Sequence, residues 1–311
     1  MAITLAQAKV GMSNKIDQTV IELFQRKSEI LDAMVFDNAI SPQGGSTLAY
    51  TYQAEVVPSL AAGRAINSDY TPGEAIREPR TTNLKVFGGA YEIDRVIANT
   101  SAKQLDEVTY QSEKKVEATI NLFHQMLIKG DSSKGEQFDG LSKLLTDTEN
   151  EVTEELTVTT INAETGNKLI NLLDDAISRC NRKPDLLITN SKGKLKLQEA
   201  ARNVGYLTQS EDAFGRKANF YDGIKIVDAG KYWDGSKLAD IVGSATTTEY
   251  YFVCFGQNEL VGLSPEGSKL VEVHLPDFTT AGAVKRGDVE AVWGLALKNT
   301  KSAAVVRNIT L

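Results

Sequence analysis

The chain has 311 residues, 41% of them hydrophobic, which is enough to bury a substantial core and favours two domains rather than one. Its formal charge of −7, from 34 basic and 41 acidic side chains, argues against nonspecific binding of nucleic acid as the main function. Two cysteines and two histidines without the spacing of metal ligands argue against a zinc site, and no apolar run of roughly 18 residues predicts a membrane span.

The first predicted element is an amphipathic helix over residues 13–36, because Ile16, Val20 and Phe24 recur at helical spacing. Such a helix either packs on the core or forms an arm that docks on a neighbouring molecule. The next segment contains a proline followed by Gly44 and Gly45, and it breaks the chain because these residues do not continue a helix. We expect the two glycines to act as a hinge.

A long hairpin is predicted next. Residues 46–57 alternate between apolar and polar side chains, which is typical of a half-buried strand. A return strand is predicted over 81–98, where the apolar phase changes across Gly88-Gly89, and we interpret this change as a bulge or a hinge. The connection 58–80 is too long for a compact hairpin. Since a lone ribbon is marginally stable in water and no nearby sequence is an obvious cover, we expect another molecule to shelter its apolar face.

Residues 101–129 are predicted to form one long amphipathic helix. Ser101 and Gln104 have the spacing of a capping box, which satisfies free amide groups in the first turn. Apolar residues then recur every three or four positions as far as Leu127, and Gly130 is placed to end the helix. A straight helix of this span would be roughly 43 Å long, at about 1.5 Å per residue.

From about residue 161 the pattern changes to shorter elements. A helix with an apolar face over 169–177 is followed by a buried strand at 185–189 and by a helix over 191–203 that Asn190 can cap. The strands predicted after this helix cover residues 223–228, 250–255, 259–263 and 270–274. This succession of helices and strands predicts a compact α/β unit.

The chain ends with two alternating segments, 289–297 and 303–309. The polar residues between them form a turn, so we predict that the segments pair as a hairpin beneath the long helix. The α/β unit at 161–275 would then be an insertion, and the first domain would be discontinuous in sequence.

The sequence contains no complete motif for catalysis, nucleotide binding or metal binding. The loop after the long helix has two glycines, but Glu136 stands where a phosphate loop needs lysine. His124 and His274 fall in predicted regular elements, which favours structural roles, and Cys180 and Cys254 are interpreted as inert thiols. The first residues lack the features of a signal peptide, so we expect a reducing cytoplasm. We predict no catalytic residue, no cofactor and no metal, and therefore a protein that is not an enzyme.

The order of these parts resembles the tailed-phage major capsid proteins of the Hong Kong phage type. The resemblance spans nearly the whole chain and includes the local patterns Ser28-Glu29-Ile30-Leu31-Asp32-Ala33-Met34, Pro58-Ser59-Leu60-Ala61-Ala62-Gly63-Arg64 and Phe138-Asp139-Gly140-Leu141. It implies an α+β fold of that capsid type. The implied parts are an N-terminal arm at 1–40, an extended β-hairpin loop at 41–98, a peripheral domain with a long spine helix at 99–160 and 276–311, and an inserted α/β axial domain at 161–275.

The resemblance also implies a function. Proteins of this family form hexamers and pentamers, which assemble into the icosahedral shell that encloses the double-stranded DNA of a tailed bacteriophage without binding a specific sequence. The location would be the virion capsid, after assembly in the host bacterial cytoplasm and without a membrane. A portal protein and a separate scaffolding protein are implied partners, because few residues precede the first predicted helix. Lys85 lies near the hairpin base, so we do not expect the lysine crosslink that some members form.

For contacts between subunits, the resemblance points to the arm and the hairpin. The predicted contact residues are Ile16, Val20, Phe24, Tyr50, Tyr52, Pro58, Arg64, Tyr70, Arg77, Arg80 and Phe87. Glycines at the two bases of the hairpin, namely Gly44, Gly45, Gly88 and Gly89, would let it tilt. Two alternatives stay open: an encapsulin, which is a bacterial compartment shell of the same fold, and a cytoplasmic enzyme that uses the inserted domain.

Overall fold

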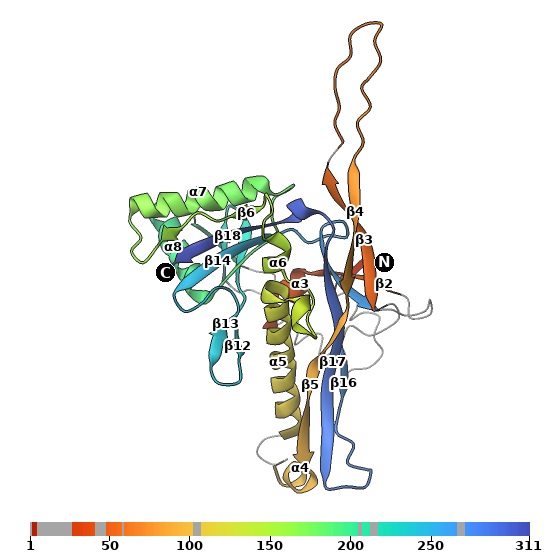
Figure 1. The fold of residues 1–311 in the computed structure, drawn as a ribbon. Helices are drawn as coiled ribbons and strands as arrows, with labels where there is room; N and C mark the ends of the chain where they lie inside the picture. The colour runs from red at the N-terminus through yellow and green to blue at the C-terminus, as the bar shows by residue number, and fades with distance from the viewer. Residues whose placement is uncertain are drawn as a thin grey trace.

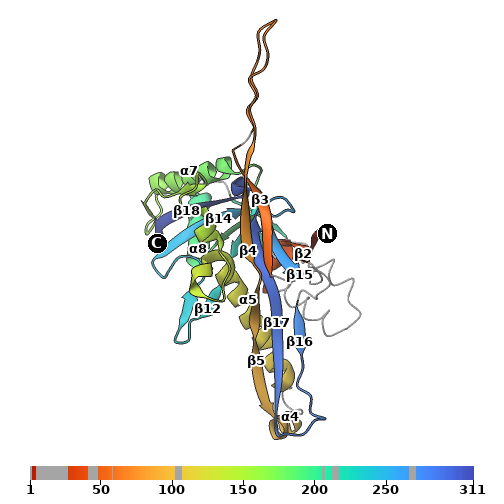
Figure 2. The same cartoon turned by 45° about the vertical axis from the view of Figure 1, so that its right-hand side comes forward.

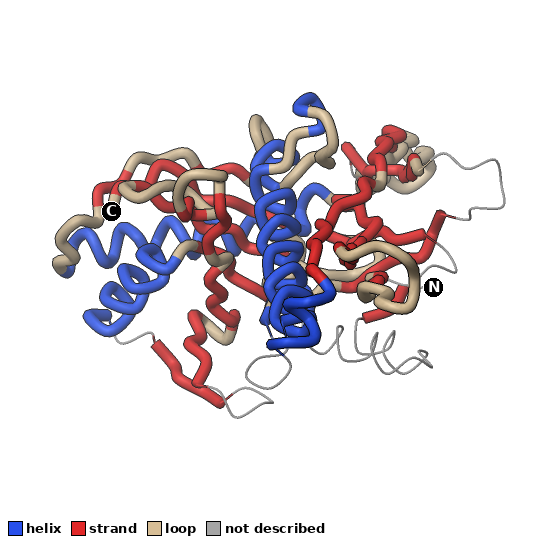
Figure 3. The backbone as a smooth tube through the Cα atoms, turned by 90° about the horizontal axis from the view of Figure 1, so that it is seen from below, coloured by secondary structure: helices blue, strands red, loops and turns tan. Residues whose placement is uncertain are grey.

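The computed structural model describes residues 2–4, 27–40, 48–57, 59–101, 107–204, 207–211, 217–265 and 271–311. They form an elongated molecule with two large β-sheets and a hairpin that projects from one end (Figure 1). Seen from below, the long helix α5 (Glu107–Lys129) lies between the strands of one sheet and the second sheet with its helices (Figure 3). Residues of α5 belong to a core that includes side chains from both sheets.

The first sheet packs against α5. Its strand order is β1-β2-β15-β17-β16, and β5 also pairs with β17. These strands are β1 (Ala2–Thr4), β2 (Val35–Ile40), β5 (Lys85–Asp94), β15 (Leu260–Pro265), β16 (Glu272–His274) and β17 (Val284–Leu297). Trp293 of β17 is fully buried, and its ring centroid lies 4.9 Å from that of Phe123 on α5. Aromatic packing between β17 and α5 therefore forms the centre of this core.

The second sheet has the order β6-β18-β14-β8-β11-β10-β9, and β7 also pairs with β18. The strands are β6 (Glu151–Val152), β7 (Leu156–Thr157), β8 (Leu186–Thr189), β9 (Leu207–Glu211), β10 (Lys217–Tyr221), β11 (Ile224–Asp228), β14 (Thr247–Val253) and β18 (Ala303–Thr310). Helices α7 (Ala163–Arg179) and α8 (Ser191–Val204) pack on one face, where Tyr250 and Phe252 are buried. Tyr251 and Val253 enter the core that contains α5. The central strands are thus buried on both faces, which explains their continuous apolar sequence.

Shorter elements complete the chain. The helical ones are α3 (Glu29–Ala33), α4 (Arg95–Ser101), α6 (Leu141–Leu145) and the 3-10 turns η1 (Ser132–Lys134) and η2 (Thr300–Ser302). Two separate hairpins are formed by β3 (Ala49–Val57) with β4 (Ile76–Asn83), and by β12 (Lys231–Trp233) with β13 (Leu238–Asp240). Within the described ranges, no helix combines the length and the apolar character needed to cross a membrane.

Several signals predicted from neighbouring residues are confirmed. Asn190 Oδ1 accepts a hydrogen bond from the Gly193 N–H (2.7 Å), so Asn190 caps α8 as expected. The long helix ends at Lys129, where the Gly130 N–H donates to the Met126 carbonyl (3.0 Å). Every residue of β8 is buried, as the apolar run predicted.

The predicted start of the long helix is wrong. Ser101 is the last residue of α4, and α5 begins at Glu107, while Gln104 lies outside the described residues. The predicted return strand ends at Asp94, because the Asp94 carboxylate accepts the Val96 N–H (2.7 Å) and starts α4 there. The strand and the long helix are thus separated by a short helix that the apolar pattern did not indicate.

The predicted terminal hairpin is also wrong. β17 pairs with β5, β15 and β16, whereas β18 pairs with β14, β6 and β7. The turn between them, residues 298–302, carries the chain from one sheet to the other. β15 and β16 likewise pair with β17 and so belong to the first sheet, although the predicted unit at 161–275 includes them. The division into domains stays a prediction.

Candidate functional site

The projecting hairpin is the most unusual surface of the described chain. β3 and β4 pair from Ala49 opposite Asn83 to Val57 opposite Ile76, and residues 59–75 continue beyond this pairing as an extended loop (Figure 2). Every residue from 59 to 75 is exposed. The exposed fraction is 79% for Leu60, 92% for Ile66 and 67% for Tyr70. The loop therefore presents several apolar side chains that nothing in the described chain covers.

The tip of this loop has a defined conformation. The Ser68 N–H and hydroxyl both donate to the Ala65 carbonyl, at 3.2 and 2.9 Å. Arg64 donates from Nη1 to the Ser68 carbonyl (3.1 Å), and its guanidinium lies 5.3 Å from the centre of the Tyr70 ring. Arg64 and Tyr70 were both predicted as contact residues. They lie together at the tip, where the turn and the contact between the guanidinium and the ring hold them in place.

The base of the hairpin is covered by the chain itself. Tyr52 is 8% exposed and Ala54 is fully buried, and both pack with Val261 of β15 and Ala296 of β17. The expectation that only another molecule shelters the apolar face is therefore wrong at the base. The first sheet supplies the cover because β15 and β17 run behind the hairpin. For the loop at residues 59–75, the prediction that another molecule covers the apolar side chains is not tested.

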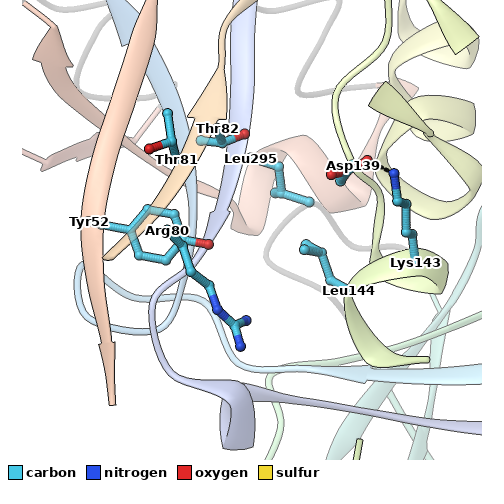
Figure 4. Close-up of a pocket in the computed structure, with 8 residues that line it drawn as sticks. All are labelled: Tyr52, Arg80, Thr81, Thr82, Asp139, Lys143, Leu144 and Leu295. Carbon is cyan, nitrogen blue, oxygen red and sulfur yellow. Dashed lines mark ion pairs between the residues drawn. The ribbon is translucent and has the colours of Figure 1, made fainter. Parts of the chain in front are cut away.

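A cavity of about 370 Å³ lies beside the hairpin base. Tyr52 and Arg80 line one side, and the ion pair between Asp139 and Lys143 (2.8 Å) lies opposite (Figure 4). Lys143 also binds Asp131 at 2.8 Å, and this hydrogen bond holds the pKa of the Asp131 carboxyl well below its usual range. The charges of this loop thus neutralise one another and leave no free acid–base pair.

Like Lys301 nearby, Arg80 forms no ion pair with any described residue. It lines the cavity with Tyr52 and also a second cavity of about 480 Å³, where Asp147 and Glu149 lie. Arg80 was predicted as a contact residue. Its position between two open cavities leaves the guanidinium accessible to a group from another molecule.

Phe87 is placed differently from the prediction. Its ring is 7% exposed, stacks on Phe123 at 6.0 Å and meets the edge of Trp293 at 5.4 Å. It belongs to the core under α5, so the prediction of a subunit contact at Phe87 is wrong. The other predicted contact residues differ in their exposure. Arg77 is exposed on β4, whereas Tyr50 is half-buried and its ring lies under the Lys298 ammonium group. Ile16, Val20, Phe24 and Pro58 lie outside the described residues.

The predicted bulge at Gly88-Gly89 is not found. β5 and β17 pair in unbroken register from Lys85 to Asp94. Gly88 has φ +157°, and a Cβ atom there would lie 1.9 Å from the Val289 carbonyl oxygen, so the close approach of the strands requires glycine. The apolar pattern seemed to shift by one position because Val86 is apolar but exposed. The buried side chains of β5 are those of Phe87, Tyr91 and Ile93, which lie at alternate positions on the face toward α5. A hinge at these glycines stays a prediction, and Gly44 and Gly45 lie outside the described residues.

A second exposed hairpin was missed. Trp233 of β12 pairs with Leu238 of β13, and their exposed fractions are 64% and 63%. Asp234 and Gly235 form the turn: the Asp234 carboxylate accepts the backbone N–H groups of Ser236 and Lys237, and Gly235 has φ +96°. The dipeptide Asp-Gly between two short apolar segments is a known hairpin signal that could have predicted this element.

The two histidines lie in different environments. His124 is buried, and His274 is exposed beside Glu272. In the part of the chain that the structure describes, no group of three or more His, Cys, Asp or Glu side chains is arranged to hold a metal ion. The exposed apolar hairpins remain the surface features to explain.

No protein-family model matches the chain, and no curated protein matches it. Several solved structures match the chain. The SrpI encapsulin of Synechococcus elongatus PCC 7942 matches with a TM-score of 0.59 and 13% identity over 99% of this chain and 96% of that chain. A structure from Mycobacterium phage Bobi matches with a TM-score of 0.54 and 12% identity over 90% of each chain.

A virus-like particle from Pyrococcus furiosus also matches, with a TM-score of 0.53 and 12% identity over 93% of this chain and 96% of that chain. At such low identity, the similarity concerns the fold. The chain has the mixed α and β fold of these shell proteins, which is the Hong Kong phage-type capsid fold, and the resemblance predicted from the sequence is confirmed.

Proposed function

We propose that the chain is the major capsid protein of a tailed bacteriophage, which self-assembles into an icosahedral shell around double-stranded DNA. The observation that carries this proposal is the projecting hairpin, whose loop exposes Leu60, Ile66 and Tyr70 to solvent. Apolar side chains this far from the rest of the chain are buried only when another molecule covers them. The fold shared with shell proteins supports a second copy as that molecule.

Assembly would depend on many weak contacts. A standard interface buries about 800 Å² per partner, and an extended loop with a few apolar side chains supplies at most a contact of this kind. One such contact dissociates readily, whereas a subunit held by several neighbours in a closed shell does not. The hairpin thus gives reversible addition during growth and a stable finished particle.

A variant with a shortened hairpin tests the proposal. A short turn replaces residues 59–75, so that the pairing of β3 with β4 and the cover on Tyr52 are retained. We expect an unchanged circular dichroism spectrum and a particle of subunit or capsomer size by light scattering and negative-stain microscopy. Shells of normal size and yield from this variant would refute the proposal.

Substitutions separate apolar contact from loop length. The triple variant Leu60→Ser, Ile66→Ser and Tyr70→Ser keeps the length of the loop but removes its exposed apolar groups. We expect this variant to assemble poorly. The matched control is Leu195→Ser on α8, which also removes an exposed apolar side chain (61% exposed) away from the hairpin. A similar loss of assembly in both variants would contradict a specific role of the hairpin.

An encapsulin is the second candidate, because the SrpI encapsulin shares the fold over 99% of this chain. The content of purified particles distinguishes the two. Nuclease-protected double-stranded DNA together with a portal protein would support the phage capsid, whereas an enzyme cargo without DNA would support the compartment. Either content would exclude the enzyme alternative if the particles are closed shells of this chain.

A further inference from the structure

An apolar cavity of about 410 Å³ opens between β5, α5 and the loop that follows α5. Phe87 of β5 and Met126 of α5 are buried, so the accessible apolar lining comes mainly from Val86, which is 49% exposed, and from Leu122, which is half-buried. A cavity of about 150 Å³ already holds benzene, so this one accommodates a large apolar side chain. The two cavities beside the hairpin base are instead lined mostly by polar and charged side chains.

Two charged side chains of opposite sign also line this apolar cavity. The Glu136 carboxylate lies 3.6 Å from Lys85 Nζ, and its side chain is 90% exposed, so this ion pair leaves most of the carboxylate accessible to another cation. The Lys134 side chain is 74% exposed, and its ion pair with Asp131 is long, at 3.9 Å. Exposed ion pairs of this kind contribute little energy, so both charges can bind groups of another molecule.

The tip of the projecting loop is complementary to this cavity. Ile66, which is 92% exposed, lies between Arg64 and Asp69 in the sequence, and both charged residues are exposed. Among the described residues, the Arg64 guanidinium binds uncharged groups, namely two backbone carbonyls and the Tyr70 ring. The tip therefore presents an apolar side chain together with one positive and one negative group, and the cavity presents an apolar lining with one charge of each sign.

The tip does not reach the cavity of its own chain. Ile66 and Val86 are joined by the second arm of the loop, by β4 and by the start of β5, which follow one another along the length of the molecule (Figure 2). Extended chain rises about 3.3 Å per residue, so the roughly 20 residues between them place the two positions roughly 60 Å apart. A loop tip that enters this cavity therefore belongs to a second copy of the chain.

We propose that the loop tip of one subunit docks in this apolar cavity of a second copy, a contact that rests on the shell function proposed above. Ile66 lies on Val86 and Leu122 of the second copy, and Arg64 pairs with its Glu136. Because the tip and the cavity are different surfaces, each subunit supplies one of each, and the copies join head to tail. Such a contact closes into a ring when its rotation allows, as the hexamers and pentamers of a shell require.

Photocrosslinking in assembled particles tests the docking. The full-length variant Ile66→p-benzoylphenylalanine is assembled together with isotope-labelled wild-type protein, and the particles are irradiated and digested. We expect crosslinked peptides that join position 66 to residues 84–88 or 122–137 of the labelled chain. Crosslinks confined to other segments of the labelled chain would overturn the docking and leave the shell function intact. Failure of the wild-type chain to form particles would instead refute both.

Charge reversal tests the pair of Arg64 with Glu136. Each of Arg64→Glu and Glu136→Arg brings two like charges together at the docked tip, so we expect each to reduce the yield of particles by about fivefold or more in light scattering. The double variant restores opposite charges, and we expect a yield within about twofold of the wild type. The control is Glu155→Arg, an exposed position outside the cavity, which changes the net charge as Glu136→Arg does and should assemble normally.

Two results of the charge reversal would overturn the proposal. One is a double variant that assembles as poorly as the single variants, although circular dichroism shows that all three fold. The other is normal assembly of both single variants. If a charge variant does not fold, the photocrosslink decides by itself, because it keeps the native charges of the tip and of the cavity.

Discussion

His124 joins three parts of the chain from the middle of α5. Its Nε2 lies 2.7 Å from Ser28 Oγ, which also accepts the Leu31 N–H at the start of α3. Its Nδ1 lies 3.0 Å from the carbonyl oxygen of Ala229, after β11. A neutral imidazole with the proton on Nδ1 satisfies both contacts: Nδ1 donates to Ala229, and Nε2 accepts from Ser28. Burial lowers the pKa of His124 from 6.5 to about 4, since the charged form is poorly solvated there.

This shift predicts a pH dependence of stability. The pKa of His124 is about 4 in the folded chain and 6.5 in the unfolded one, so the unfolded chain binds a proton first as the pH falls. The free energy of unfolding should be constant above about pH 7 and should decrease between pH 6.5 and 4, by about 3 kcal/mol. Urea titrations at a series of pH values measure this decrease.

The matched controls are two histidine variants. In His124→Gln the part of the decrease due to this histidine should disappear, leaving only the effect of carboxylates. In His274→Gln, where the histidine is exposed, the full decrease should remain. Parallel pH profiles for the wild type and His124→Gln would contradict the assignment.

Gly88 allows a second prediction for a single residue. An added Cβ would lie 1.9 Å from the Val289 carbonyl oxygen, and φ is +157°, so Gly88→Ala must push β5 away from β17. We expect a loss of stability of about 2 kcal/mol or more in urea titrations. Gly63→Ala in the projecting loop is the control, because a Cβ there has no atom within 4 Å. Equal stability of the two variants would argue against the close approach.

The hairpin of β12 and β13 leads to a prediction for one element. Trp233 and Leu238 pair across its strands and are mostly exposed, and an exposed tryptophan is a frequent anchor of interfaces. In a shell of this chain, we expect Trp233→Ser to fold normally and to reduce the yield of particles by severalfold. Circular dichroism and light scattering measure the two effects. Full assembly of Trp233→Ser would exclude this hairpin from the subunit contacts.

Elements set by local chemistry could be predicted from the sequence. The cap of α8 by Asn190 and the end of α5 before Gly130 depend on residues a few positions apart. The start of α4 after Asp94 could not, because the predicted strand continued through this position and only the Asp94 cap marks the change. The defined tip of the projecting loop also escaped prediction, since it depends on the position of Arg64 over Tyr70.

Strand pairing is a property of the whole molecule, and the sequence predicted it poorly. β17 and β18 both alternate and follow one another closely, which is the pattern of a hairpin. Yet β18 sends Val305 into the core under α5 and Val306 into the core under α7, so both of its faces are buried. Alternating apolar residues indicate that a strand is buried but do not identify the strand it pairs with. The crossing of the chain from the first sheet to the second between β17 and β18 therefore could not be predicted from the pattern.

The shared strands predict that the two cores unfold together. Because β14 and β18 contribute to both cores, loss of either core would expose one face of these strands in the other. We expect a single cooperative transition in urea, although two domains were predicted. Trp293 reports on the core under α5 once Trp233→Phe removes the exposed tryptophan, and far-ultraviolet circular dichroism reports on the whole chain. The chain with the shortened hairpin is used, so that assembly does not contribute. Coincident midpoints are expected, and two separated transitions would mean that the cores are independent.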